Sequence, residues 1–380
     1  MANTNTLTYA VPTLLAQGLM ALRQNCVMPR LVNSNFENMA SEKMATINVP
    51  VPSAIAIVQV SPSYVAPDDV GVVPTSVPIT LDQWWEAPFF MSDKDLLESI
   101  NGTVPMQASE AIKTIANKID AALLGLYVDV YGYAGSAGVT PFASDVSEIT
   151  AARKTLNNQL APLDDRRFVI NADAEANALG LRAFQDMSFS GSAAGIVDGK
   201  LNRKLGFDWY MDQNVPTHTT GTVAVSFINK SGTSVAAGLK TLVSTTGGTA
   251  ALLNGDVFTI AGDTQTYALT AAASRSGGGD MTIVFEPGLK IPLTGGEAIT
   301  LKASHTVNLA FHRDAFAFVS RPLADNADGL GNIIQSAIDP VSGLALRLEV
   351  SRQHKRTRFS YDVLYGLACV RPELACRVAG

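Results

Sequence analysis

The sequence predicts an α+β fold, and three patterns lead to that prediction. A helical period of 3.6 residues runs from Pro105 to about Tyr131. Apolar and polar residues alternate, as they do in strands, over residues 45–81 and again over residues 344–363. Residues 222–304 contain short strand patterns and turn dipeptides without a strong helical pattern. We therefore expect a helix-containing body into which an all-β segment is inserted.

The composition is that of a folded protein with a small share of charged residues. The 380 residues are 47 % hydrophobic and 16 % charged, whereas about 25 % of the residues in an average soluble domain are charged. Because few charges are available to cover an isolated surface, we expect other chains to cover much of it. Lys and Arg number 28 against 34 Asp and Glu, and the net charge of −6 argues against a general nucleic-acid-binding protein.

No stretch of the sequence predicts a membrane span or a secretory signal. The most apolar stretches, residues 51–60 and 119–133, are interrupted by polar or charged residues, and a span needs about 20 apolar residues. The first ten residues contain no cation. The three cysteines, Cys26, Cys369 and Cys376, form no CxxC pair, which favours reduced, buried thiols in a cytosolic protein.

Residues 1–44 predict an N-terminal arm that contains a short amphipathic helix. Leu15, Leu19 and Leu22 fall on one helical face, and Pro29 prevents the helix from continuing. No segment nearby in the sequence covers that face. We interpret the helix as an arm that lies on another part of an assembly, with docking within the same chain as the alternative.

Residues 45–90 predict an extended hairpin. Val49 lies in the outgoing alternating stretch, and Val77 lies in the returning one. Proline cannot donate to a sheet ladder, so it is confined to edges and bends. We expect a projecting hairpin that a neighbouring subunit holds, with a proline-rich surface loop as the alternative. Six of the 18 prolines fall between residues 45 and 81: Pro50, Pro52, Pro62, Pro67, Pro74 and Pro78.

The long helix is followed by a block that mixes helices and strands. Residues 144–161 and 174–184 predict helices. Residues 167–171 and 206–212 predict strands. We expect this block to form a mixed α/β unit that continues beyond the all-β insertion.

Residues 222–304 predict an inserted domain. Asn254-Gly255 is one of several turn dipeptides between short alternating runs. Five or six short strands of this kind describe a small antiparallel barrel or sandwich. The mixed α/β pattern of the preceding block resumes at Val307. Strands predicted at 344–350 and 359–363 enclose a basic turn near the end of the chain.

The catalytic, cofactor-binding and metal-binding motifs that we considered are all incomplete. His312-Arg313-Asp314 matches a kinase catalytic loop, but Val319 stands where that loop needs an asparagine. The four histidines lack zinc-ligand spacing, and Gly329-Leu-Gly331 lacks the third glycine of a dinucleotide-binding loop. We therefore expect no enzymatic activity, no catalytic residue, no cofactor and no bound metal.

Two clusters are candidates for contacts between subunits. Trp84 and Trp85 lie in an aromatic segment at the base of the hairpin. The two alternative roles for these side chains are anchoring an interface and packing in the core. The basic turn at residues 352–358 is interpreted as a solvated hairpin tip or an ion-pair partner of another subunit, since one small cluster in an acidic chain gives little affinity for phosphates. The candidate intersubunit contacts are Leu15, Leu19, Val49, Val77, Trp84, Trp85, Arg352, Lys355 and Arg356.

Several stretches of the sequence carry a family resemblance. They are Val11-Pro-Thr-Leu-Leu-Ala-Gln-Gly-Leu-Met20, Val27-Met-Pro-Arg-Leu-Val32, Asn214-Val-Pro-Thr-His-Thr-Thr-Gly221, Phe311-His-Arg-Asp-Ala-Phe316, Asp362-Val-Leu-Tyr-Gly366 and Arg371-Pro-Glu-Leu-Ala375. Together with the order of the segments, they resemble the major capsid (coat) proteins of tailed bacteriophages, which have the Hong Kong 97-type fold. The likeness is greatest to the short-tailed-phage coat proteins that carry an inserted β-barrel domain.

The resemblance implies a division of the chain into five parts. Residues 1–44 would be the N-terminal arm and residues 45–90 the E-loop hairpin. The peripheral domain, with the spine helix, would comprise residues 91–135 and 344–380. The axial domain would comprise residues 136–221 and 305–343, and residues 222–304 would be the inserted β-barrel domain.

The resemblance also implies a function. It implies a homo-oligomer of pentamers and hexamers that self-assembles into an icosahedral shell around a double-stranded DNA genome, without sequence-specific binding and without a membrane. Scaffolding and portal proteins are the implied partners. The implied location is the virion, after synthesis and assembly in the cytoplasm of the bacterial host. The alternative is a bacterial surface or array structural protein built from β modules.

Overall fold

The computed structural model describes residues 10–35, 46–52, 57, 62, 74–94, 103–186, 199, 201, 203–323, 332–339 and 343–380. The chain forms two compact units, each built from separate stretches. The first unit comprises residues 1–20, 34–112 and 317–370, and the second comprises residues 21–33, 113–316 and 371–380. Helices α1 (Ala10–Asn25) and α4 (Thr103–Leu124) contribute residues to both units. The five-part division implied by the resemblance stays a prediction.

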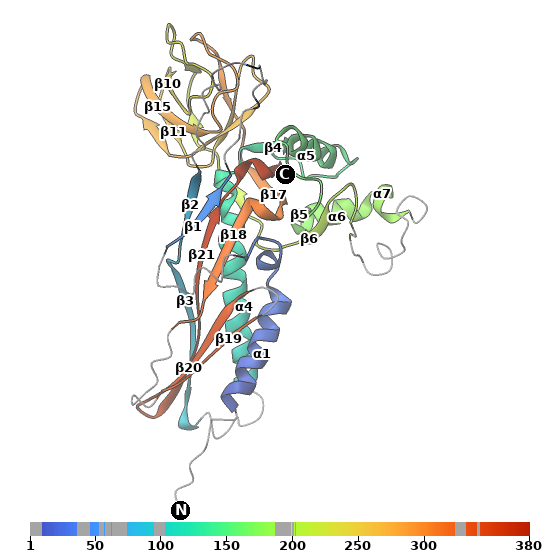
Figure 1. The fold of residues 1–380 in the computed structure, drawn as a ribbon, viewed down its shortest axis with the longest axis vertical. Helices are drawn as coiled ribbons and strands as arrows, with labels where there is room; N and C mark the ends of the chain where they lie inside the picture. The colour runs from blue at the N-terminus through green and yellow to red at the C-terminus, as the bar shows by residue number, and fades with distance from the viewer. Residues whose placement is uncertain are drawn as a thin grey trace, which may run out of the picture. The chain divides into compact units, whose positions relative to one another are not determined.

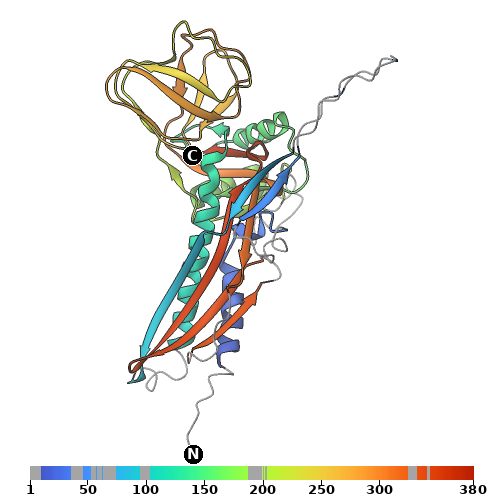
Figure 2. The same cartoon turned by 60° about the vertical axis from the view of Figure 1, so that its left-hand side comes forward.

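The first unit is built on an antiparallel sheet of long strands. β21 (Arg356–Cys369) lies between β20 (Ala345–Gln353) and β3 (Gln83–Ser92). β19 (Ile333–Ile338) pairs with β20, and β18 (Phe316–Arg321) neighbours β21. Figure 2 shows β3 in blue-green beside the red strands β20 and β21. The predicted strand pair near the end of the chain is confirmed, and β3 is a further strand that the sequence did not predict.

Helix α1 packs on residues of its own chain. Leu15 is buried, and a Cβ added at Gly18 would come within 2.7 Å of the Cδ1 atom of Ile112 on α4. The same position is 3.4 Å from the ring of Tyr361 on β21. Since a glycine is what permits this close approach, the apolar face of α1 is covered within the chain. This finding corrects the interpretation of the helix as an arm on another part of an assembly, and the alternative of docking within the chain applies.

The base of the predicted hairpin is a two-stranded ribbon. β1 (Thr46–Val51) pairs with β2 (Thr75–Thr80) from Thr46↔Thr80 to Val51↔Thr75. Ile47, Val49 and Ile79 are buried against Ala317 and Val319 of β18. This base is thus held by its own unit rather than by a neighbour. Most of the segment between β1 and β2 lies outside the described residues, and the prediction of a projecting hairpin lies there with it.

The second unit contains a mixed sheet flanked by short helices. The strand order is β4 (Gly132–Gly135), β22 (Ala375–Ala379), β17 (His305–His312), β5 (Arg166–Ile170) and β6 (Asp208–Met211), and β7 (Thr217–His218) pairs with the start of β17. The helices are α5 (Ser147–Asn158), α6 (Ala172–Gly180) and α7 (Arg182–Gln185), and short 3-10 turns are η2 (Met28–Arg30), η4 (Arg313–Ala315) and η5 (Pro372–Leu374). The helix predicted at 144–161 is confirmed as α5, and the one at 174–184 is split between α6 and α7.

The long helix differs from its prediction at both ends. It begins at Thr103 and is α-helical only to Leu124, after which η3 (Gly125–Asp129) continues as a 3-10 turn. Glycine is a poor helix former, and 3-10 turns are frequent at the ends of α-helices. Asp120 in the last third of α4 is buried and accepts hydrogen bonds of 3.0 Å from the backbone N–H groups of both Val27 and Met28. The helix therefore positions the start of η2 within the second unit.

Residues 222–304, called the β module below, form sheets of their own within the second unit. One sheet has the order β16 (Ile299–Leu301), β12 (Val257–Ile260), β13 (Thr266–Leu269), β15 (Gly279–Glu286), β10 (Thr241–Thr246) and β9 (Phe227–Asn229). A second sheet has the order β14 (Ala273–Arg275), β11 (Ala250–Leu252) and β8 (Thr222–Val223). Figure 1 shows β10, β11 and β15 in one compact group of strands. A shared apolar core that includes Phe258, Tyr267 and Phe285 fills the module.

Candidate assembly surface

The edge strand β3 presents aromatic side chains on both faces of the first unit's sheet. Within the described residues β3 pairs only with β21. Side chains alternate between the faces of a strand, so Trp84 and Phe90 share one face and Trp85 lies on the other. The exposed fractions are 61 % for Trp84, 48 % for Phe90 and 42 % for Trp85. Single exposed apolar residues are ordinary, but aromatic side chains clustered along one edge are typical of an interaction site.

An ion pair fixes the sheet beneath Trp84. Arg347 on β20 donates to both oxygens of Asp362 on β21, from Nε to Oδ1 at 3.0 Å and from an Nη atom to Oδ2 at 2.6 Å. The indole Nε1 of Trp84 donates to the same Oδ2 atom at 3.2 Å. Asp362 is buried, with 4 % of its surface exposed. The exposed indole therefore has a fixed orientation, which lowers the entropy cost of using it as a binding anchor.

Two arginines of β21 lie next to Phe90. The guanidinium carbon of Arg356 is 4.5 Å from the centre of the Phe90 ring, and that of Arg358 is 5.9 Å away. Arg358 also pairs with Glu86 on β3, and the Ser360 hydroxyl donates to the same carboxylate at 2.5 Å. Cations over an aromatic face are attracted by the ring quadrupole. We call Trp84, Phe90, Arg356 and Arg358 the aromatic face.

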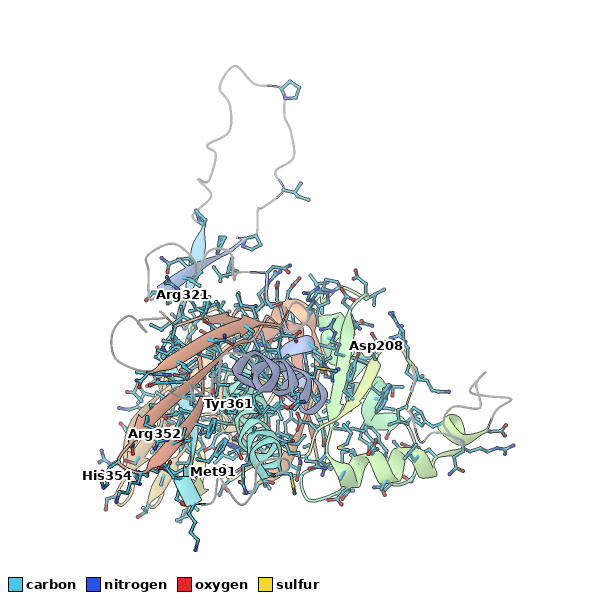
Figure 3. The ribbon with its side chains drawn as sticks, turned by 90° about the horizontal axis from the view of Figure 1, so that it is seen from below. Met91, Asp208, Arg321, Arg352, His354 and Tyr361 are labelled. Carbon is cyan, nitrogen blue, oxygen red and sulfur yellow. The ribbon has the colours of Figure 1, made fainter. Side chains whose placement is uncertain are left out.

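The turn between β20 and β21 lies at the tip of the same ribbon. Its two residues are His354 and Lys355, and Lys355 has the unusual positive φ of 55°. Arg352 forms an exposed ion pair with Asp93 at 2.7 Å. Figure 3 shows Arg352 and His354 at this tip, away from Tyr361, which lies beside α1. Lys355 of the turn and the flanking strand residues Arg352 and Arg356 are thus three exposed cations on the surface of the first unit.

The structure separates the nine predicted contact residues into three groups. Leu15 and Val49 are buried in the first unit, so their side chains do not reach a neighbour, which corrects their selection. Leu19 and Val77 are half-buried. The exposed group is Trp84, Trp85, Arg352, Lys355 and Arg356.

Phe90, Glu86 and Arg358 lie in the two clusters that the sequence indicates, but they are not among the nine residues predicted as contacts. Phe90 lies six residues after Trp84, so a period of two was the signal that could have placed both rings on one face. No local signal indicates that β3 pairs with a strand about 270 positions later in the chain. The partners of Glu86 and Phe90 therefore depend on a tertiary register that only the structure supplies.

The described residues offer little for catalysis or metal binding. They contain no group of three or more His, Cys, Asp and Glu side chains that could hold a metal ion. His312 accepts a hydrogen bond of 3.2 Å from the backbone N–H of Asp314, so it caps the η4 turn rather than forming part of a kinase loop. Among the described helices, none is long and apolar enough to span a bilayer.

A cleft of about 490 Å³ lies on the β module. Its walls are residues of the segments 220–227 and 299–304, and Lys302 is the one ionisable side chain among the lining residues. Acid–base and nucleophilic catalysis need a pair or triad of reacting groups within hydrogen-bond reach of one another. The lining of this cleft therefore does not define an active site.

Comparison with known proteins finds likeness in structure rather than in sequence. The search of family models and the search of curated proteins return no match. A solved structure from Mycobacterium phage Che8 is similar with a TM-score of 0.53 and 15 % sequence identity, over 93 % of this chain and 90 % of that one. The resemblance to a phage protein is therefore confirmed at the level of the fold.

Two more distant structures are similar over most of their length. One is described as the capsid structure of the cyanophage P-SCSP1u, with a TM-score of 0.49, 10 % identity, and coverage of 89 % of this chain and 84 % of that one. The other is described as the mature capsid of bacteriophage PhiM1, with a TM-score of 0.47, 11 % identity, and coverage of 89 % and 82 %. Because both TM-scores are below 0.5, these two structures are distant similarities only.

Proposed function

We propose that this chain is the major capsid protein of a tailed bacteriophage and that it self-assembles into an icosahedral shell around double-stranded DNA. The observation that carries the proposal is the fold shared with the Mycobacterium phage Che8 structure over nine-tenths of both chains. A likeness that covers both chains almost completely concerns the whole architecture rather than one common motif. The role proposed is structural and not enzymatic.

The chemistry of the chain supports a shell subunit. A shell requires large permanent interfaces, which typically bury 2,000 Å² or more, and a chain with 16 % charged residues has little charge to cover such surfaces in isolation. The net charge of −6 also suits a wall that encloses DNA without adhering to it. Partners of the shell subunit would be further copies of the chain, a scaffolding protein and a portal protein, and its place would be the virion.

The aromatic face is our proposed contact between subunits. Interface anchors are enriched in Trp and Arg side chains that are held in fixed positions and become desolvated on binding. Trp84 is held by Asp362, and Phe90 lies beside two arginines. Trp85, Arg352 and Lys355 are proposed as surrounding contacts, because they are exposed on the same unit. Leu19 and Val77 remain proposed contacts only through the minor part of their surface that is exposed.

Electron microscopy of the purified chain tests the proposal. The protein is expressed alone and together with the other head genes of a phage that encodes it, and the particles are sized by light scattering and imaged. Closed shells of uniform diameter support the proposal. Flat or tubular arrays would instead support the surface-array alternative, and a monomer under every one of these conditions would overturn both.

A further inference from the structure

The β module meets the rest of the second unit through a buried cluster of ionisable residues. The cluster comprises Tyr127, His218, Asp256, His305 and Arg377, which we call the junction cluster. Asp256 belongs to the module, whereas the other four belong to η3, β7, β17 and β22. Asp256 and Arg377 have no exposed surface, and His218 and His305 have 3 % and 2 % exposed. Groups this deeply buried must be satisfied by one another.

Arg377 joins the module to η3. Its Nε atom donates to the carbonyl of Val130 at 2.7 Å, and its Nη atoms donate to Gly255 at 2.7 Å and to Val128 at 3.1 Å. Gly255 is a module residue, while Val128 lies in η3 and Val130 directly follows it. Burial lowers the pKa of Arg377 to about 10, so the side chain remains a cation at neutral pH.

Asp256 provides the second set of bonds across the junction. Across the junction it accepts from His218 Nε2 at 2.9 Å and from the Gly221 N–H at 3.2 Å. Within the module it accepts from the Leu253 N–H at 2.8 Å. The Tyr127 hydroxyl is 3.0 Å from His218 Nδ1. The tautomer with its proton on Nε2 donates to the carboxylate while Nδ1 accepts from the tyrosine, so this tautomer satisfies both neighbours.

His305 is the member of the cluster with a buried ring nitrogen that has no hydrogen-bond partner among the described residues. Its Nδ1 atom donates to the carbonyl of Ala303 at 2.8 Å, whereas its Nε2 atom is buried without a hydrogen-bond partner among the described residues. The ring lies 5.5 Å from the His218 ring and 5.3 Å from the Tyr133 ring, measured between centres. The neutral ring fits this site, because a bare nitrogen lone pair costs less to bury than a charge.

If Nε2 of His305 were protonated, its N–H group would have no acceptor to donate to among the described residues. The charged and titratable groups that contact or act on His305 are Tyr133, His218, Asp256 and Arg377. Tyr127, Asp129 and Lys302 interact with those groups in turn, Tyr127 with His218, Asp129 with Arg377 and Lys302 with Tyr133. The Asp256 carboxylate already accepts from His218, Gly221 and Leu253. Burial is the largest cause that lowers the pKa of His305, and Arg377 and His218 act in the same direction, which brings the pKa to about 4.

We propose that the junction cluster is an acid-sensitive latch, in which one proton taken up at Nε2 of His305 releases the β module from η3 and β22. The open form hydrates His305 and separates the new cation from Arg377. The closed form keeps the His305 ring neutral and all three Arg377 hydrogen bonds in place. The latch is independent of the proposed function, since it depends only on contacts inside the second unit.

Hydrogen exchange measured by mass spectrometry on the full-length, unassembled protein tests the latch. Exchange is followed from pH 7.5 to pH 4.5 and corrected for the intrinsic rates. If the open form has an ordinary histidine pKa near 6.5, the opening constant of peptides covering residues 125–134 and 250–258 should rise about tenfold per pH unit below that value. Peptides from the module core at residues 281–286 should keep their protection.

Matched variants separate His305 from the other groups. His305→Phe keeps an aromatic ring beside Tyr133 but cannot titrate, so it should abolish the pH dependence of the junction peptides. His354→Phe alters an exposed histidine in the first unit and should leave that dependence unchanged. Equal pH dependence in the unaltered protein and in His305→Phe would overturn the latch, as would simultaneous loss of protection in the module core.

A direct titration keeps the proposal testable if His305→Phe does not fold. Carbon-13 labelled histidine in the unaltered protein reports the protonation of each ring by NMR. His305 should remain neutral down to about pH 5, well below the ordinary histidine pKa of about 6.5. A His305 ring that titrates near pH 6.5 without any opening of the junction would overturn the proposal.

Discussion

Arg347 and Asp362 form a two-point ion pair across strands β20 and β21, with N–O distances of 3.0 and 2.6 Å. The two residues are directly opposite each other in the strand register. Their side chains have 13 % and 5 % of their surface exposed. The pair therefore lies largely out of water, where each charge depends on the other.

Replacing Arg347 by methionine should destabilise the first unit strongly. The substitution leaves the Asp362 carboxylate buried beside Trp84 without its cation, and breaking a buried pair in this way typically costs about 3–5 kcal/mol. Urea unfolding followed by the fluorescence of Trp84 and Trp85 measures the loss. The matched control is Arg352→Met, which breaks an exposed pair with Asp93 and should cost less than about 1 kcal/mol. Equal losses in the two variants would contradict the prediction.

Replacing Gly366 by alanine should loosen the base of the hairpin. A Cβ at this position on β21 would come within 2.5 Å of the carbonyl oxygen of Thr80 on β2, and backbone atoms cannot move away as a flexible side chain can. Overpacking of this kind typically costs about 1–3 kcal/mol. Hydrogen exchange should show reduced protection in β2 with little change in β20.

The control for this prediction is Gly180→Ala. Gly180 ends α6, and an added Cβ there meets nothing within 4 Å. Alanine is the better helix former, so this substitution should be neutral or stabilising by up to about 1 kcal/mol. A Gly366→Ala protein as stable as the Gly180→Ala protein would show that β2 does not approach β21 as closely as described.

The sequence predicts elements well where one face of a segment is buried and the other is solvated. β20 and helix α5 have such alternation or periodicity, and both are confirmed. β21 is confirmed as well, although residues 359–363 are buried on both faces. β3 is different, because aromatic residues occupy both faces and Pro88 interrupts the run. Proline is tolerated at this point because β3 is an edge strand within the described residues.

The candidate site is less predictable from the sequence than the fold. Trp84 and Trp85 could be selected because exposed aromatics anchor interfaces. The choice of Val49 failed because alternation shows that a side chain faces a core without showing which chain supplies that core. Here β18, which lies about 270 positions later, supplies it through Ala317 and Val319. Contacts of this range carry no local signal.

The stability of the second unit should fall as the pH rises from about 4 to about 7, because of Asp120. Burial raises the pKa of Asp120 to about 7, against the opposing hydrogen bonds from Val27 and Met28, and the nearby Asp212 adds to the rise. In the unfolded chain an aspartate has a pKa of about 3.9. Between the two values the unfolded state has released a proton that the folded state retains, so stability is lost as the pH increases, by about 1 kcal/mol per pH unit.

Urea unfolding at pH 5, 6 and 7 tests the role of Asp120. In a background with Trp84→Phe and Trp85→Phe, the remaining Trp209 reports on the second unit. Asp120→Asn should be destabilising at pH 5, since one amide oxygen cannot accept from both backbone N–H groups as the carboxyl does. The difference from the parent protein should shrink toward pH 7. Asp164→Asn, at an exposed position, should leave the pH dependence of the parent unchanged.

Truncating the aromatic face should weaken assembly without weakening the fold. We expect Trp84→Ala and Phe90→Ala each to raise the concentration at which particles form by about tenfold, since an interface anchor is typically worth more than 1 kcal/mol and tenfold corresponds to about 1.4 kcal/mol. Sedimentation of particles over a concentration series, under conditions that assemble the unaltered protein, measures this threshold.

Leu163→Ala is the control, because Leu163 is 63 % exposed, close to the 61 % of Trp84, and lies in the second unit. If all three variants assemble at the same concentration as the unaltered protein, the surface around β3 is not the contact. If the two aromatic variants unfold more easily in urea, the rings instead stabilise the sheet through Asp362 and the arginines.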